Sequence, residues 1–330
     1  MAMMNMNREN WAVRGWEGVL LHVPSEWDIA AISGDRNQGY MRIDDTQNMP
    51  RVELKWQKST GFVNVTGVVD GYLKDLQKKR KKGEPEIETD RDCSVVSKRQ
   101  MRKQDLQCFA WRGAIEGYGA AWYCPDCQRV MVVQVMALPD ERGAELAREV
   151  IGSLEDHPHD GWITWSTYGL QMEVPERFEM SGQKLMAGLI ELRFANAGEE
   201  IVGVRWGMAN VVLRGRTLEN WAAAEIRDYH KGTKLEMTET TFRGHPAVEV
   251  SGYFINPLKH MQSFVMHIAR RPYADVVQGW VWHCVDENRI YYAGALLDEE
   301  HKEIIKRVAE SIVCPEDAAA ETGDGKGPIR

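Results

Sequence analysis

The chain has 330 residues, of which 43% are hydrophobic and 27% are charged, and its formal net charge is −8. This length predicts about two domains, and the composition is that of an ordinary globular protein. The negative net charge disfavours general binding to nucleic acid, because such binding requires a basic surface.

Other features of the composition bear on location. The sequence has no apolar run of about 18 residues, so it predicts no membrane span. Residues 1–14 lack the apolar segment of a signal peptide, and the six cysteines are too few for a disulfide framework. We therefore expect a cytoplasmic protein with mainly reduced thiols. The cationic run at residues 78–82 is interpreted as the solvated end of a helix, with a nucleic-acid or localisation patch as the alternative.

The first strands are predicted from a repeat within the sequence. Residues 11–29 align without a gap with residues 162–180, so that Pro24 matches Pro175. Apolar and polar residues alternate before each proline, as in a half-buried strand that ends at Val-Pro. Two further strands are expected in each half, over residues 40–44 and 51–56 in the first and 189–193 and 201–206 in the second.

A helix is predicted next in each half. Apolar residues recur at helical spacing between positions 65 and 76, and Thr217 is the expected N-cap of the corresponding helix in the second half. The strands that follow are predicted over residues 93–101, 106–115, 119–124 and 129–138, and over 235–242, 247–254, 261–270, 275–285 and 289–296. Each half is expected to end in a helix, over residues 139–154 and 298–313.

These elements predict the domain organisation. We expect one domain over residues 1–156, a polar linker over 157–161, a second domain over 162–315 and a disordered tail over 316–330. Hairpin-length connections indicate mainly antiparallel sheets with helices packed on them. The predicted fold class is therefore α+β, in two tandem copies of a mainly antiparallel sheet flanked by helices.

Both halves contain the motif Trp-x-Cys-x4-Arg. Its first copy is formed by Trp122, Cys124 and Arg129, and its second by Trp282, Cys284 and Arg289. We expect each Trp on the strand that enters the last hairpin and each Cys at the end of that strand, on the same face as the Trp. Each Arg should begin the return strand, where it could stack on an aromatic ring, form a local salt bridge or contact an anionic ligand.

The first copy alone contains Cys127 and therefore the pattern C-x-x-C. Cys124 and Cys127 could bind Zn²⁺ as thiolates, although a structural zinc site requires four ligands. Cys93, Cys108, His283 or Cys284 could supply further ligands. The pair could instead cycle between dithiol and disulfide, or consist of two ordinary turn cysteines. His157 and His159, which flank Pro158, could bind a metal weakly, but they are interpreted as solvated residues of the linker.

The order of elements resembles the fold shared by the photosystem protein PsbP, the Ran-binding protein Mog and DcrB-like bacterial proteins. Residues 168–175, 242–252 and 308–313 carry this resemblance, whereas residues 102–105 lack the glycine turn that the family has there. The resemblance implies an accessory or binding protein and assigns no functional residue. Since the sequence also lacks the common nucleotide-binding and hydrolase motifs, we expect a non-catalytic protein that acts through a protein partner. The alternative is a metal-binding or thiol-redox protein that uses Cys124 and Cys127.

Overall fold

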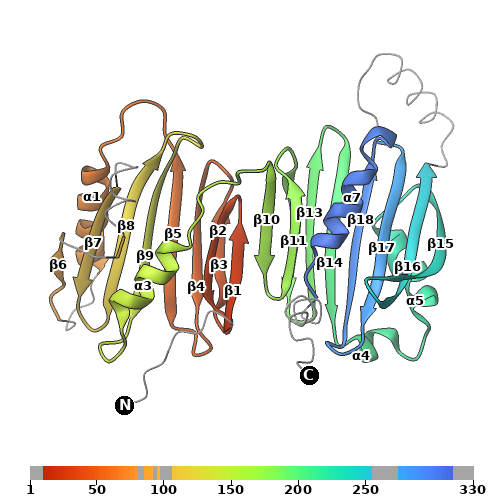
Figure 1. Ribbon diagram of the computed structural model, residues 1–330, viewed down its shortest axis with the longest axis horizontal. Helices are drawn as coiled ribbons and strands as arrows, with labels where there is room; N and C mark the ends of the chain where they lie inside the picture. Colours follow the sequence, from red (N-terminus) through yellow and green to blue (C-terminus); the bar gives the residue numbers. More distant parts are fainter. Residues whose placement is uncertain (1–9, 80–84, 92–94, 97–105, 255–273, 315–330) are drawn as a thin grey trace, which may run out of the picture. The chain divides into compact units, whose positions relative to one another are not determined.

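The computed structural model describes residues 10–79, 85–91, 95–96, 106–254 and 274–314. The chain divides into two compact units. The first extends to Asp160 and includes Thr164–Thr167, and the second comprises Gly161–Ile163 and the chain from Tyr168 onward. Figure 1 labels most of the elements of both units.

The first unit contains a seven-stranded sheet of order β3-β4-β5-β9-β8-β7-β6, in which all neighbouring strands are antiparallel. Helix α1 (Val65–Lys79) connects β5 in the middle of the sheet to β6 at its edge, and the chain then returns strand by strand to β9 beside β5. The strands are β3 (Asp28–Gly34), β4 (Gln38–Asp44), β5 (Pro50–Lys58), β6 (Glu88–Asp90), β7 (Leu106–Arg112), β8 (Glu116–Cys124) and β9 (Arg129–Ala137).

The second unit contains an antiparallel sheet of order β12-β13-β14-β18-β17-β16-β15. Here α4 (Ala209–Leu213), α5 (Leu218–Glu225) and the 3-10 turn η2 (Ile226–Asp228) connect β14 in the middle to β15 at the edge. The strands are β12 (Glu179–Met186), β13 (Leu189–Asn196), β14 (Glu199–Gly207), β15 (Thr233–Phe242), β16 (His245–Phe254), β17 (Val276–Cys284) and β18 (Arg289–Leu297).

Two further neighbouring strands begin each half, β1 (Trp11–Trp16) and β2 (Val19–Pro24) in the first and β10 (Trp162–Thr167) and β11 (Leu170–Pro175) in the second. Glu17 and Gly18 join β1 to β2 with φ angles of 51° and 80°. Two consecutive positive φ angles give the tight turn whose twist suits a hairpin. This turn explains why residues 11–24 form two strands rather than one.

Helices cover both faces of the sheet in the first unit. Side chains of α1 pack on Phe109, Trp111 and Ala121 in a buried cluster. On the strand after Ala121 successive side chains alternate between faces, so Trp122 and Cys124 point to the opposite face, where α3 (Gly143–Gly152) packs on β8 and β9. In the second unit α7 (Glu303–Ser311) follows the 3-10 turn η3 (Glu299–His301) and packs on β17 and β18. Figure 1 shows α3 and α7 each crossing a sheet.

The expected class, α+β with mainly antiparallel sheets, is confirmed, and so is the N-cap at Thr217, whose side chain accepts a hydrogen bond from the Asn220 amide. The prediction of three strands before the first helix of each half is wrong, because five strands precede it in each case. The expected strand at residues 261–270, most of that at 93–101 and the tail at 316–330 lie outside the described residues. Within the described residues, no helix has the length and apolar character needed to cross a membrane.

Candidate metal centre

The hairpins that carry the repeated motif have the predicted geometry. Strand β8 ends at Cys124, β9 begins at Arg129, and these two residues are register partners; Cys284 and Arg289 are related in the same way by β17 and β18. Each motif Trp is buried on the strand that enters the hairpin. The expected positions of Trp, Cys and Arg within both hairpins are therefore confirmed.

The hairpin of the first unit brings four potential metal ligands together. Ligand atoms of Cys124, Cys127, Asp156 and His157 all lie within 4.8 Å of one another. Cys124 Sγ is 3.5 Å from His157 Nδ1, which is 2.7 Å from Asp156 Oδ1. Two ligands come from the hairpin and two from the segment after α3, so residues distant in sequence converge on one point.

Backbone pairing places Asp156 and His157 beside the hairpin. Glu155 exchanges two backbone hydrogen bonds with Leu20 of β2, at 2.9 and 2.8 Å, which extends that strand's pairing to the chain beyond α3. The guanidinium of Arg129 donates to the carbonyl oxygens of Asp156 and Glu17. Within the described residues, Arg129 is thus a buried structural donor to backbone oxygens, rather than a stacking residue or a salt-bridge partner.

The Asp156 carboxylate is held by the motif tryptophan. Trp122 Nε1 donates a 2.8 Å hydrogen bond to Asp156 Oδ2, while Asp156 Oδ1 faces the His157 ring. Partners of this kind fix the orientation of metal ligands and are part of the design of metal sites. A pocket of about 350 Å³ adjoins the cluster, so a cation and its hydration shell have access to it.

Burial controls the protonation of the Cys124 thiol. Desolvation raises the pKa of the Cys124 thiol to about 12, with a smaller contribution from the nearby Asp156 carboxylate. At neutral pH this thiol is therefore protonated unless a cation neutralises it, which does not favour a reactive thiolate. The His157 side chain is only 19% exposed, so its interpretation as a solvated linker residue is wrong, whereas His159 is exposed as expected.

The donor set fits zinc. A tetrahedral site with Zn–S of 2.3 Å and Zn–N of 2.0–2.1 Å separates sulfur and nitrogen by about 3.5 Å. The observed distance from Cys124 Sγ to His157 Nδ1 is 3.5 Å. The 2.7 Å contact from His157 to Asp156 is a hydrogen bond, and the carboxylate oxygen would have to withdraw by roughly 0.7 Å to share an ion with the ring.

The other ligands suggested by the sequence lie elsewhere. Cys93 is outside the described residues, Cys108 is buried in β7 without joining the cluster, and His283 belongs to the second unit. Sequence reasoning missed Asp156 and did not join His157 to the cysteine pair, because their approach to the hairpin depends on the path of the chain after α3. Their one local signal was a carboxylate and an imidazole at adjacent positions.

Cys284 belongs to a second cluster, within the second unit. It lies with His245 and Cys314, the ligand atoms of all three being within 4.8 Å of one another, and all three residues are buried. The thiols of Cys284 and Cys314 are in contact, with their sulfur atoms 2.7 Å apart. Arg289, at the start of the return strand, forms the local salt bridge expected for it, with Glu287 at 3.2 Å.

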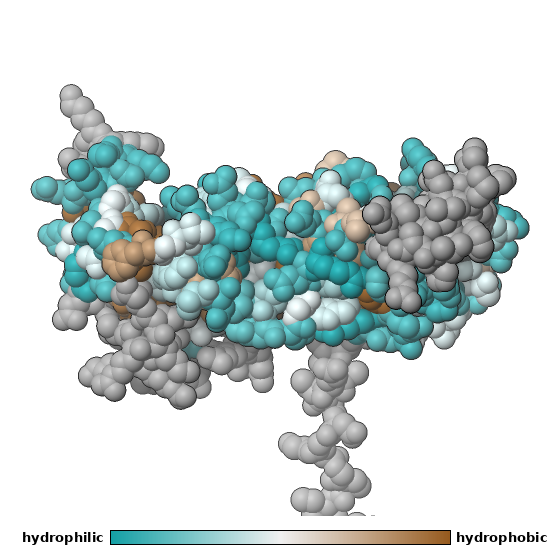
Figure 2. Space-filling view, turned by 90° about the horizontal axis from the view of Figure 1, so that it is seen from above, coloured by the Kyte–Doolittle hydropathy of each residue, from teal (hydrophilic) through white to brown (hydrophobic). Residues whose placement is uncertain are grey.

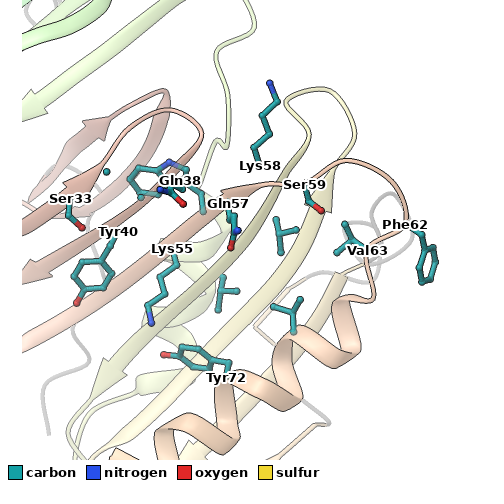
Figure 3. A pocket seen from close by; sticks show the side chains of 16 residues that line it. Ser33, Gln38, Tyr40, Lys55, Gln57, Lys58, Ser59, Phe62, Val63 and Tyr72 are labelled. Atoms are coloured by element: carbon teal, nitrogen blue, oxygen red, sulfur yellow. The ribbon is translucent and has the colours of Figure 1, made fainter.

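The first unit also has a larger pocket, of about 870 Å³, beside α1. Figure 3 shows Lys55 between the rings of Tyr40 and Tyr72, whose centroids lie 5.9 and 5.4 Å from its Nζ atom. Phe62 points away from the pocket at its rim and is 95% exposed. The pocket therefore combines a cation, aromatic walls and an exposed apolar side chain.

No known protein-family profile matches the chain, and no curated protein matches it either. The candidate sites are therefore interpreted from their own geometry.

Proposed function

We propose that the protein is a non-catalytic binding or accessory protein whose first unit holds one zinc ion through Cys124, Cys127, Asp156 and His157. The observation that carries this proposal is the convergence of the four ligand atoms within 4.8 Å. Four protein ligands complete a tetrahedral shell, as in structural zinc sites, whereas catalytic sites keep one position open for water or substrate.

A zinc ion at this place would cross-link two parts of the first unit. It would join the turn of the β8–β9 hairpin to the segment after α3, which otherwise is held by backbone hydrogen bonds and by Arg129. Because binding to a folded site adds to folding free energy, the ion would stabilise the end of the sheet. Thiolate and imidazole donors favour zinc over Mg²⁺ or Ca²⁺, which prefer oxygen ligands.

The test is the metal content of the full chain purified without chelator. We expect about one tightly bound zinc per chain, and loss of the zinc in Cys124→Ser and His157→Ala. The matched control is Cys108→Ser, which removes a buried thiol of the same unit outside the cluster. Wild-type protein without zinc, and with Cys124 and Cys127 forming a reversible disulfide, would replace the metal proposal with the thiol-redox alternative.

The binding part of the proposal is supported by the pocket beside α1 and by the fold. The two seven-stranded sheets have the same strand order and the same crossover from the central strand to the edge, which supports tandem copies of one fold. Residues 59–64 of the first unit form a loop at the open pocket, whereas the residues after Trp206 form α4, whose Val212 and Leu213 pack on the core. We therefore assign partner binding to the first unit.

The pocket's chemistry suits an acidic segment of a protein partner with an apolar side chain. Lys55 supplies positive charge between two aromatic rings, and Phe62 supplies exposed apolar area. On the face shown in Figure 2 hydrophilic residues predominate and hydrophobic ones form small patches. A photo-crosslinking residue at Phe62 should capture the partner, and one at Val211, which is exposed on α4, should not. Equal capture at both positions would contradict this assignment.

A further inference from the structure

We infer that Cys284 and Cys314 form a reversible intramolecular disulfide under oxidising conditions, making the second unit a site of thiol modification. The inference is independent of the zinc proposal, because it concerns other residues in the other unit. It rests on the contact between the two thiols, on the way Cys314 is held and on the neighbouring histidine.

The sulfur atoms are closer than a shared metal would place them. A tetrahedral zinc ion with two Zn–S bonds of 2.3 Å separates the sulfurs by about 3.8 Å. Those of Cys284 and Cys314 are 2.7 Å apart, so they would have to separate by roughly 1 Å to bind zinc but approach by only about 0.7 Å to reach a disulfide bond length. The geometry therefore favours sulfur–sulfur bonding over coordination.

The segment that carries Cys314 is fixed in place. Arg243, in the turn between β15 and β16, donates hydrogen bonds from Nη1 to the carbonyl oxygens of Glu310 and Ile312, at 2.9 and 2.7 Å. Cys314 follows two residues later and is fully buried, as is Cys284 at the end of β17. Because both ends are positioned before any reaction, bond formation requires little loss of conformational freedom.

His245 completes the site. Its Nε2 atom is buried and makes no hydrogen bond within the described part of the chain, and a ring nitrogen of His245 lies within 4.8 Å of both sulfurs. A neutral imidazole at this distance can accept the proton of an attacking thiol, and the thiolate is the species that reacts with oxidants. His245 is thus assigned as the base that assists the reaction.

The oxidant we name is a hydroperoxide, of which hydrogen peroxide is small enough to reach a buried thiol. The first thiol loses its proton to His245, and its sulfur attacks one peroxide oxygen, which breaks the O–O bond. This gives a sulfenic acid, and the hydroxide that leaves takes up a proton to become water. The second sulfur then attacks the sulfenic sulfur, its proton leaves with the departing hydroxide as a second water, and the disulfide results. Two thiols are oxidised by two electrons and one peroxide is reduced to two waters.

The experiment treats the full-length, reduced protein with hydrogen peroxide and maps its peptides by mass spectrometry without reduction. We expect one cross-linked pair that contains Cys284 and Cys314, lighter than the separate peptides by two hydrogens and restored by dithiothreitol. His245→Gln should slow its formation at least several-fold, since it removes the base. Cys108→Ser is the control and should leave both the product and its rate unchanged.

Three results would overturn the inference. The first is that both thiols remain reduced at peroxide concentrations that oxidise free cysteine. The second is that Cys284 or Cys314 forms a disulfide with a different cysteine. In the third case, Co²⁺ added to a Cys124→Ser protein would give a thiolate charge-transfer band that Cys314→Ser abolishes, and the cluster would then be a metal site. The mapping uses wild-type protein, so its result does not depend on whether a cysteine variant folds.

Discussion

The clusters around Cys124 and Cys284 lie at equivalent positions of the two units but contain different neighbouring side chains. Cys124 and Cys284 each end the strand that enters a hairpin, and each pairs in register with the arginine that starts the return strand. Beside Cys124 lie a second thiol, a carboxylate and an imidazole, and beside Cys284 lie a thiol and an imidazole. The hairpin supplies one fixed sulfur, and the remaining residues determine the chemistry.

The residues opposite the hairpins are placed by equivalent contacts. After α3, Ser153 accepts a hydrogen bond from the His22 amide and donates one to the Val150 carbonyl, at 2.9 and 2.8 Å. At the end of α7, Ser311 accepts from the amide of Glu173 and donates to the carbonyl of Val308, at 2.8 and 2.7 Å. Three residues beyond these serines stand Asp156 and Cys314 respectively. The exchange of Asp156 for Cys314 at this equivalent position, together with that of Cys127 for Glu287 in the hairpin, separates a mixed metal-ligand set from a thiol pair.

The largest expected effect tests whether the two hairpins are equivalent in stability. Trp122 and Trp282 are 5% and 1% exposed, and Trp→Ala at either position should destabilise its own unit by about 3–5 kcal/mol through the cavity that it creates. Urea denaturation of the full chain, followed by peptide-resolved hydrogen exchange, assigns the loss to a unit. A loss below about 1 kcal/mol at one position would break the comparison, since it would show that the two tryptophans have different structural roles.

Lowering the pH should affect the second unit more. Burial, assisted by the charge of Arg193, lowers the pKa of His230 from 6.5 to about 4. Between pH 6.5 and pH 4, His230 is protonated in the unfolded chain but remains neutral in the folded chain. The free energy of unfolding therefore keeps its full value above pH 6.5 and decreases as the pH falls toward 4. The loss amounts to about 3 kcal/mol.

Denaturation of the second unit at pH 7 and pH 4.5 measures this dependence. His230→Gln should flatten it, because glutamine does not titrate. The matched control substitution is His22→Gln, at an exposed position of the first unit. An unchanged pH profile in His230→Gln would show that the folded state accepts the proton on His230.

A smaller change separates the two clusters by their affinity for zinc. Trp122→Phe removes the hydrogen bond to the Asp156 carboxylate while keeping an aromatic ring in the core. Loss of such an orienting partner should weaken zinc binding by about 10–100-fold. The equivalent Trp282→Phe should leave the affinity unchanged. Competition with a chromophoric chelator measures both, and equal weakening in the two variants would show that Trp122 does not act through Asp156.

The smallest effect concerns the N-terminal ends of α1 and α5, which lie in the equivalent crossovers of the two units. Asn64 Oδ1 accepts a hydrogen bond from the Gly67 amide at the start of α1, and Thr217 Oγ1 accepts one from the Asn220 amide at the start of α5. Alanine at either position should cost about 1 kcal/mol of stability. Thermal denaturation of the two variants should show similar decreases. A decrease confined to one variant would mean that the two crossovers are not equivalent.

Periodicity and the internal repeat predict much of the fold. Alternation located β4, β5, β13 and β14, and the motif located the hairpins at Cys124 and Cys284. The division of residues 11–24 into β1 and β2 was missed because the turn at Glu17 and Gly18 is short and its flanks share one apolar pattern. A tight turn of this type leaves little trace in hydrophobic periodicity.

The candidate site was less predictable, for a physical reason. The C-x-x-C pair is local and was visible in the sequence, whereas Asp156, His157 and Cys314 reach their partners only through the packing of α3 and α7. Contacts between residues distant in sequence depend on tertiary structure, which no local pattern encodes. The contact of Cys284 with Cys314 rather than with Cys124 illustrates this dependence.

The most direct test of the difference between the clusters is native mass spectrometry of the full chain, purified without chelator, as wild type, Cys124→Ser and Cys314→Ser. The account predicts one zinc ion in the wild type and in Cys314→Ser, and none in Cys124→Ser. Zinc that persists in Cys124→Ser and disappears in Cys314→Ser would contradict it, because the metal would then belong to the cluster assigned here to sulfur–sulfur bonding.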